Sequence, residues 1–171
     1  AGMPIAAGNL FIGTFDGSSA MADPLGATHF GLPLGQKPVR FLGHYRYISG
    51  GNVTGKDGKE IIPVRRDIGQ IYAILYETDD NVKRLDGTNQ FTHPNLISIA
   101  RIDNQKETNE WVEFNIPFKM QPGKTIDNNK LKNKKYNVAI VFSSSLEGDH
   151  FNGAVGSTLY IDNVELEYKA N

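Results

Sequence analysis

The sequence predicts an all-β chain folded as a β-sandwich with jelly-roll topology. Apolar and polar residues alternate with a period of two along several segments, which is typical of strands. Turn sequences rich in glycine, proline, asparagine and aspartate separate these segments. No segment repeats its apolar residues at the 3.6-residue period of a helix. Strands joined by turns, without helices between them, argue against an α/β fold.

The clearest strand is predicted from Val39 to Ile48, because the two faces of this segment differ in composition. One face holds Phe41, Gly43, Tyr45 and Tyr47, and the other holds Leu42, His44, Arg46 and Ile48. The segment from Gln70 to Glu77 is instead apolar on both faces, which predicts a central strand covered on each side.

Four further strands are expected at residues 96–102, 111–118, 136–144 and 158–168, and weaker ones at 10–15 and 61–65. The turn signals between strands include Leu85-Asp86-Gly87, and the lysine-rich stretch 128–135 is expected to be a solvated loop. The predicted inward-facing residues are Phe41, Tyr45, Leu75, Phe114, Phe118, Val138, Ile140, Leu159 and Ile161.

Length and charge limit the classes of function. The 171 residues suit a single domain spanning 1–171, and we expect a monomer. The formal net charge of −1 argues against nucleic acid as a partner, and no apolar run is long enough to insert into a membrane. The absence of cysteine excludes disulfides, thiolate zinc sites and cysteine nucleophiles. The N-terminal residues lack the charged and apolar regions of a signal peptide, and we expect the chain to be a piece excised from a longer protein.

Exposed aromatic and polar side chains on one sheet face indicate a carbohydrate-binding surface. The apolar C–H faces of sugar rings pack on aromatic rings, and sugar hydroxyls bond to amides, carboxylates, arginine and histidine. Trp111 lies on the polar face of its strand, although a strand-end position half-buried under a loop is an equal alternative for this residue. The predicted carbohydrate-binding residues are His44, Arg46, Tyr72, Trp111, Glu113 and Asn115, with Asp149 and Asn152 at the rim.

Catalysis is a weaker interpretation of the same residues. A glycosidase requires two carboxylates across a cleft, and the candidates are Glu77, Glu113, Glu147 and Asp149. The serines at 143–145 near Asp149 and His150 suggest a triad, but they lack the GxSxG turn of a nucleophile elbow. We therefore assign no catalytic residue.

The last predicted strand changes its inward face at Asp162-Asn163, which predicts a β-bulge there. Asp162 is expected either to ligate a structural calcium or to accept hydrogen bonds from backbone N–H groups at the bulge. No cofactor is required, and calcium is the one metal that these residues suggest.

Three segments resemble the putative carbohydrate metabolism domain family over about residues 31–168. They are GLPLGQKPVRFLGHYRYISG, DIGQIYAILYE and FSSSLEGDHFNGAVGSTLYIDNVELEY. The family is found in exported proteins and lipoproteins of gut bacteria, and it is similar in fold to jelly-roll carbohydrate-binding modules and some glycanases. The resemblance supplies no catalytic residues. The sequence YIDNVEL also resembles the closing strand of galactose-binding-like modules, which implies a calcium role for Asp162 and for a first-strand carboxylate such as Asp16.

Residues and resemblance together predict a non-catalytic carbohydrate-binding domain for a polysaccharide or oligosaccharide. A glycoside hydrolase with its acid pair on the sheet face is the first alternative, and an adhesion or assembly module is the second. The resemblance implies a location outside the cytoplasm, in the periplasm or at the cell surface, as part of a lipoprotein.

Overall fold

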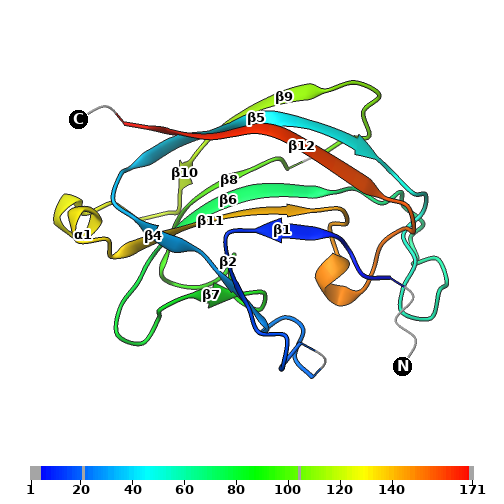
Figure 1. Cartoon of the computed structure of the whole chain (residues 1–171), viewed down its shortest axis with the longest axis horizontal. Coiled ribbons are helices and arrows are strands. Elements are labelled where there is room, and N and C mark those ends of the chain that lie inside the picture. The colour runs from blue at the N-terminus through cyan, green and yellow to red at the C-terminus, as the bar shows by residue number, and fades with distance from the viewer. Residues whose placement is uncertain (1–4, 21, 104, 170–171) are drawn as a thin grey trace.

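A computed structural model describes residues 5–20, 22–103 and 105–169, and these consist mainly of strands (Figure 1). The strands form three antiparallel sheets stacked as three layers. The helical turns α1 (Asn128–Lys132) and η1 (Gly148–His150) are five and three residues long. The all-β sandwich predicted from the sequence is confirmed, and its jelly-roll connectivity stays a prediction. Within the described residues, no helix is long and apolar enough to cross a membrane.

The middle layer, here called the central sheet, consists in order of β1 (Asn9–Phe11), β11 (Tyr136–Ser143), β6 (Gln70–Glu77), β8 (Leu96–Arg101) and β10 (Lys119–Met120). The other end of β11 pairs with β4 (Leu32–Leu34). The outer sheet consists of β12 (Thr158–Tyr168), β5 (Pro38–Ile48) and β9 (Val112–Pro117). The small sheet consists of β2 (Gly13–Phe15), β3 (Thr28–Phe30) and β7 (Leu85–Asp86).

Both faces of the central sheet are buried. Ile71 and Ala73 of β6 pack toward the outer sheet, in a cluster that includes Phe41. Tyr72 and Ile74, on the opposite face of β6, pack in a second cluster with residues of the small sheet. The prediction that 70–77 is a central strand covered on each side is therefore confirmed.

The predicted core is also confirmed. Six of its members are buried, namely Phe41, Tyr45, Leu75, Phe114, Val138 and Ile140. The remaining three, Phe118, Leu159 and Ile161, are partly buried and pack against the same core.

The structure corrects the type or the bounds of four predicted segments. Residues 61–65 form a loop, because Ile62 and Val64 are exposed and Pro63 has no N–H to donate. Residues 10–15 form two strands in different sheets, and the second begins at Gly13, where a Cβ would collide with the carbonyl oxygen of His29.

The other two corrections concern short elements. The predicted turn at 85–87 contributes β7. The predicted loop 128–135 contains α1, because the Asp127 carboxylate accepts hydrogen bonds from the N–H groups of Asn129 and Lys130, and Leu131 is buried.

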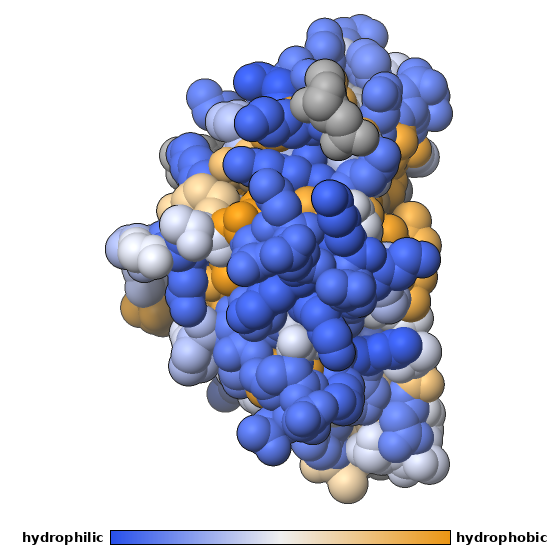
Figure 2. Space-filling model, turned by 90° about the vertical axis from the view of Figure 1, so that its left-hand side faces the viewer, coloured by the Kyte–Doolittle hydropathy of each residue, from blue (hydrophilic) through white to orange (hydrophobic). Residues whose placement is uncertain are grey.

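The end of the molecule that carries α1 is mostly hydrophilic, with smaller apolar areas between the polar side chains and along its sides (Figure 2). A polar hollow at this end is lined by Glu77, Lys130 and neighbouring residues. Glu77 forms an ion pair with Lys130 at 2.5 Å. The described residues that line this hollow include no aromatic side chain on which a sugar ring could stack, and we look for the site elsewhere.

A buried carboxylate joins the two long loops at the opposite end of the sandwich. The Oδ2 atom of Asp67 accepts hydrogen bonds from the Ser145 hydroxyl at 2.6 Å, the Ser157 hydroxyl at 2.8 Å and the Ala154 N–H at 2.9 Å. Asp67 is only 2% exposed. These contacts, here called the Asp67 cluster, hold the segment 144–157 against the loop that precedes β6.

We predict that Asp67→Ala lowers the free energy of unfolding by about 3 kcal/mol or more, because it leaves three buried donors without their shared acceptor. The measurement is urea unfolding. Asp80→Ala is the control, because the exposed Asp80 has only an ion pair with Lys83 among the described residues, and its loss is expected to cost at most about 0.5 kcal/mol. Equal stabilities of the two variants would contradict the role given to Asp67.

Candidate functional site

Most of the predicted binding residues lie together on the solvent side of the outer sheet. In the antiparallel register, His44 of β5 pairs with Asp162 of β12 on one side and with Glu113 of β9 on the other. Directly opposite residues in a sheet project from the same face. This surface, here called the outer-sheet face, comprises His44, Arg46, Trp111, Glu113, Asn115, Tyr160 and Asp162.

One row of the outer-sheet face combines two aromatic rings with a guanidinium group. Arg46 pairs with Tyr160, and its guanidinium carbon lies 5.9 Å from the centre of the tyrosine ring. Trp111 immediately precedes Val112, the partner of Tyr45, and therefore lies at the level of Arg46 on the other side of β5. Tyr160 is 45% exposed and Trp111 is 48% exposed, so about half of each side chain is open to solvent. The sequence analysis did not identify Tyr160. Its position two residues before Asp162 predicts that both side chains project from the same face of the strand.

The adjacent row places a histidine between two carboxylates. Neighbouring strands lie about 4.8 Å apart, and the backbones that carry Glu113 and Asp162 are therefore about 10 Å apart across His44. The Nδ1 atom of His44 and the Nε atom of Arg46 are buried and have no hydrogen-bond partner among the described residues. Because both atoms are buried, a ligand on this face could reach them only if these side chains moved.

Asn115 is held by Arg40 at the next level of the same face. The Nε atom of Arg40 donates to the side-chain oxygen of Asn115, and its Nη2 atom donates to the Asn115 carbonyl oxygen at 3.1 Å. These two hydrogen bonds hold the Asn115 side chain in place at the edge of the outer-sheet face.

The other predicted residues lie elsewhere. Tyr72 is 1% exposed and lies on the face of the central sheet that turns away from the outer sheet. Asp149 lies in η1, and both residues line a hollow between the central and small sheets. Asn152 donates to Glu147 at 3.1 Å, and Glu147 also pairs with Arg65 at 2.5 Å. The structure thus divides the predicted site between two surfaces.

The hollow between the central and small sheets, here called the inter-sheet hollow, has a volume of about 410 Å³. Five aromatic side chains line it, namely Phe11, Phe15, Phe30, Tyr72 and Phe151. Burial raises the pKa of the Tyr72 hydroxyl and the negative charge of Asp149 raises it further, whereas a hydrogen bond with the Gln90 side chain opposes this rise. The hydroxyl therefore stays neutral at physiological pH.

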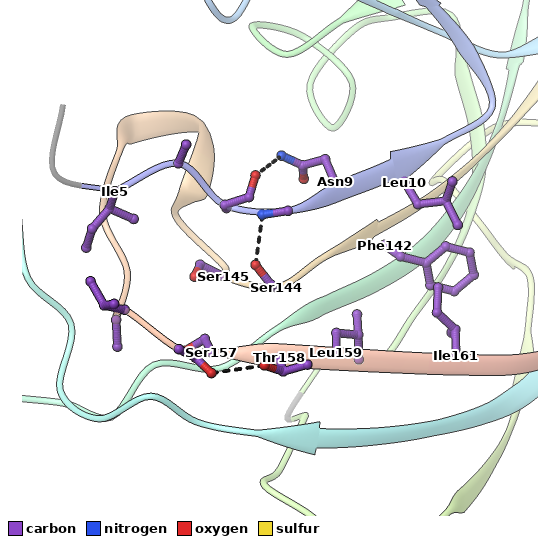
Figure 3. A pocket seen from close by; sticks show the side chains of 16 residues that line it. Ile5, Asn9, Leu10, Phe142, Ser144, Ser145, Ser157, Thr158, Leu159 and Ile161 are labelled. Carbon is purple, nitrogen blue, oxygen red and sulfur yellow. Dashed lines mark hydrogen bonds between the residues drawn. The ribbon is translucent and has the colours of Figure 1, made fainter.

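A third hollow lies between β1, at the edge of the central sheet, and β12, at the edge of the outer sheet (Figure 3). Leu10, Phe142, Leu159 and Ile161 lie at one end, whereas Ser144, Ser145 and Ser157 lie at the other. Its volume is about 610 Å³, and none of the described residues that line it is charged. Phe142 is its single aromatic ring and is buried in the core, so this hollow is poorly suited to stack a sugar.

The candidate acids are divided within the fold. Glu77 and Glu113 lie in different sheets, whereas Glu147 and Asp149 line one small hollow, where Glu147 is paired with Arg65. In the serine-rich segment, the Ser145 hydroxyl donates to the buried Asp67, whereas the nearby His150 is exposed and contacts Asp149 at 2.8 Å.

The two predicted calcium ligands also lie in different parts of the fold. Asp16 follows β2 of the small sheet and accepts hydrogen bonds from Ser18, whereas Asp162 lies in the outer sheet. Among the described residues, no three histidine, aspartate or glutamate side chains converge as a metal site would require. Calcium ligation by Asp162 stays a prediction, and its further ligands would have to come from groups other than Asp16, such as backbone carbonyls.

The bulge predicted at Asp162 is present. The register with β5 shifts between Asp162 and Glu165, and Asn163 has a φ of +50°. The Asp162 carboxylate is exposed and accepts a hydrogen bond from the Asn163 N–H at 2.8 Å.

Comparison with known proteins identifies close structural relatives. A family model described as a putative carbohydrate metabolism domain matches residues 1–167. A crystal structure of a putative glycoside hydrolase from Bacteroides thetaiotaomicron VPI-5482 is 60% identical, with a TM-score of 0.94, over 99% of this chain and 49% of that one. A second, from Bacteroides vulgatus ATCC 8482, is 46% identical, with a TM-score of 0.90, over 98% of this chain and 66% of that one.

The chain thus spans about half to two thirds of the length of these two proteins. No curated protein matches it.

We predict that Asp162→Ala lowers the free energy of unfolding by about 0.5 to 1.5 kcal/mol, because the bulge loses its side-chain acceptor. Glu165→Ala, on the same exposed strand, is the control. Thermal unfolding with EDTA and with added calcium separates the two roles, because a calcium site makes the melting temperature of the native chain rise with the metal. An Asp162→Ala variant as stable as the native chain would leave Asp162 without a structural role.

Proposed function

Because the chain belongs to the putative carbohydrate metabolism domain family, we propose that it is a non-catalytic carbohydrate-binding domain. Its binding surface is the outer-sheet face, and its ligand is an oligosaccharide or a segment of a polysaccharide. The row of Tyr160, Arg46 and Trp111 carries this proposal, because two exposed aromatic rings flank a charged hydrogen-bond donor.

The arrangement of the surface fits an extended sugar chain. Aromatic rings stack on the apolar faces of successive sugar rings, whereas the His44 and Asn115 levels offer donors and acceptors to hydroxyl groups. The exposed carboxylate of Glu113 supplies an acceptor on the same face. A strand-backed face also holds these groups rigidly, and little conformational entropy is lost when a ligand binds.

Two similar structures are described as putative glycoside hydrolases, and this makes hydrolysis the second candidate function. Glu113 and Asp162 lie on either side of His44, on backbones about 10 Å apart, whereas the carboxyl groups of an inverting enzyme lie about 6.5 to 9.5 Å apart. Both carboxylates are exposed on an open sheet face. A glycosidase general acid requires surroundings that keep it protonated, and this open face favours binding over hydrolysis.

The family resemblance supports a location outside the cytoplasm, in the periplasm or at the cell surface. An adhesion or assembly role, in which the same face meets another protein, is the remaining alternative.

We predict that Trp111→Ala weakens glycan binding by about 1 to 3 kcal/mol, or roughly 5- to 150-fold, because a stacked aromatic ring is lost. A glycan array identifies the ligand, and titration calorimetry measures the affinity. Trp111 is the single tryptophan, so its emission also reports ligand binding at this face in the native chain. Ile62→Ala, which removes an exposed apolar side chain of the loop 61–65, is the control. Full affinity in a folded Trp111→Ala variant would remove the outer-sheet face as the binding surface.

A hydrolysis assay on the glycans that bind distinguishes the candidate functions. We expect no release of reducing ends by the native chain. Hydrolysis that Glu113→Gln abolishes would establish the enzyme instead, whereas the absence of any glycan binding would favour the assembly module.

A further inference from the structure

The inter-sheet hollow has the composition of a small-molecule site. Its volume of about 410 Å³ lies near the lower end of the range for such pockets, roughly 300 to 1,000 Å³. It lies under β11 and β6 of the central sheet and is closed from the other side by β2 and β3 and by the segment around η1. Apolar rings and a few polar groups line it together, as ligand pockets require.

The apolar part of the lining is aromatic. Phe11 and Phe30 pack edge to face, with ring centres 5.7 Å apart, and this contact fixes their orientation. Phe15 is 59% exposed, although it lies beside this buried cluster. An exposed ring at the margin of a pocket is a surface on which a sugar can stack.

The polar part of the lining includes Gln70, Tyr72, Gln90 and Asp149. The amide nitrogen of Gln90 donates to the carbonyl oxygens of Asp86 and Gly87 at 2.6 and 2.7 Å, which fixes this side chain in place. Asp149 Oδ1 contacts the ring of His150 at 2.8 Å. The Gln70 amide and Asp149 Oδ2 make no hydrogen bond with any other residue in the described part of the chain, and both can bond to a ligand.

The charge of the lining selects against anions. Asp149 is the one carboxylate among the described residues that line the hollow, and no lysine or arginine is among them. An anionic sugar would be repelled by Asp149 and would find no countercharge. A neutral pyranose fits both parts of the lining, because it has an apolar ring face and a hydroxyl-bearing edge.

A shallower hollow of about 230 Å³ continues from the first. The two share Gln70, Gln90 and Asp149, and the second also includes Thr88, Thr92 and His150. A ligand that enters the inter-sheet hollow can therefore extend past these three residues into a more polar groove.

We propose that the inter-sheet hollow is a second carbohydrate site, which takes an uncharged terminal pyranose of an oligosaccharide, with the next sugar in the adjoining groove. Phe15 stacks on the ring, and Gln70 and Asp149 bond to its hydroxyl groups. This site is separate from the outer-sheet face and shares with the proposed function only the class of ligand.

The test uses ¹H–¹⁵N nuclear magnetic resonance of the whole chain. Its probes are the methyl glycosides of glucose, galactose and mannose, their disaccharides, and the corresponding uronates. We expect at least one neutral probe to shift the side-chain amide signals of Gln70 and Gln90 without changing the emission of Trp111. Uronates are expected to bind at least about tenfold more weakly, and Asp149→Asn to reduce that difference.

Two variants locate the effect. Phe15→Ala is expected to weaken binding at this site by about fivefold or more, whereas Leu10→Ala, an exposed apolar residue of the neighbouring hollow, leaves it unchanged. The proposal is overturned if no probe shifts Gln70 and Gln90 at up to about 20 mM, well above a millimolar Kd, or if Phe15→Ala leaves the shifts unchanged. Trp111→Ala tests binding at the outer-sheet face alone. The proposal for either site can therefore be contradicted while the proposal for the other still holds.

Discussion

The fold depends on one constraint, which is that the two middle strands of the central sheet are apolar on both faces. β6 and β11 are buried along almost their whole length. Leaving either face in water would expose large aromatic and aliphatic side chains, at roughly 25 cal/mol per Å² of apolar surface. Both faces must therefore be covered, and the outer and small sheets cover them.

This three-layer arrangement creates both candidate sites. The outer sheet uses its inner face to cover the core, and its other face is free to display the row of Tyr160, Arg46 and Trp111. The small sheet has only short strands and covers the central sheet incompletely, which leaves the inter-sheet hollow beside Tyr72. A flat surface suits an extended stretch of a sugar chain, whereas a hollow suits the terminal sugar of such a chain.

The Asp67 cluster connects the core to the loops that carry polar groups. It holds Ser145, Ala154 and Ser157 within the segment that also contains η1 and Asp149. This explains why Ser145, in the serine-rich sequence that suggested a catalytic triad, is buried and donates to Asp67. Gly153 belongs to the same arrangement, because a Cβ at this position would lie 2.6 Å from the Ser145 hydroxyl oxygen.

The sequence by itself determined the long strands, their buried faces and the polar face that holds His44, Arg46 and Trp111, because alternation in a strand is a local property that its residues encode directly. It did not determine β3, β7 or α1, since two- to five-residue elements carry too little periodicity. Only the tertiary structure decided that Tyr72 and Asp149, 77 positions apart, share a hollow while Tyr72 and Trp111 do not. The physical reason is that the stacking of sheets is set by non-local packing, which no single segment of sequence contains.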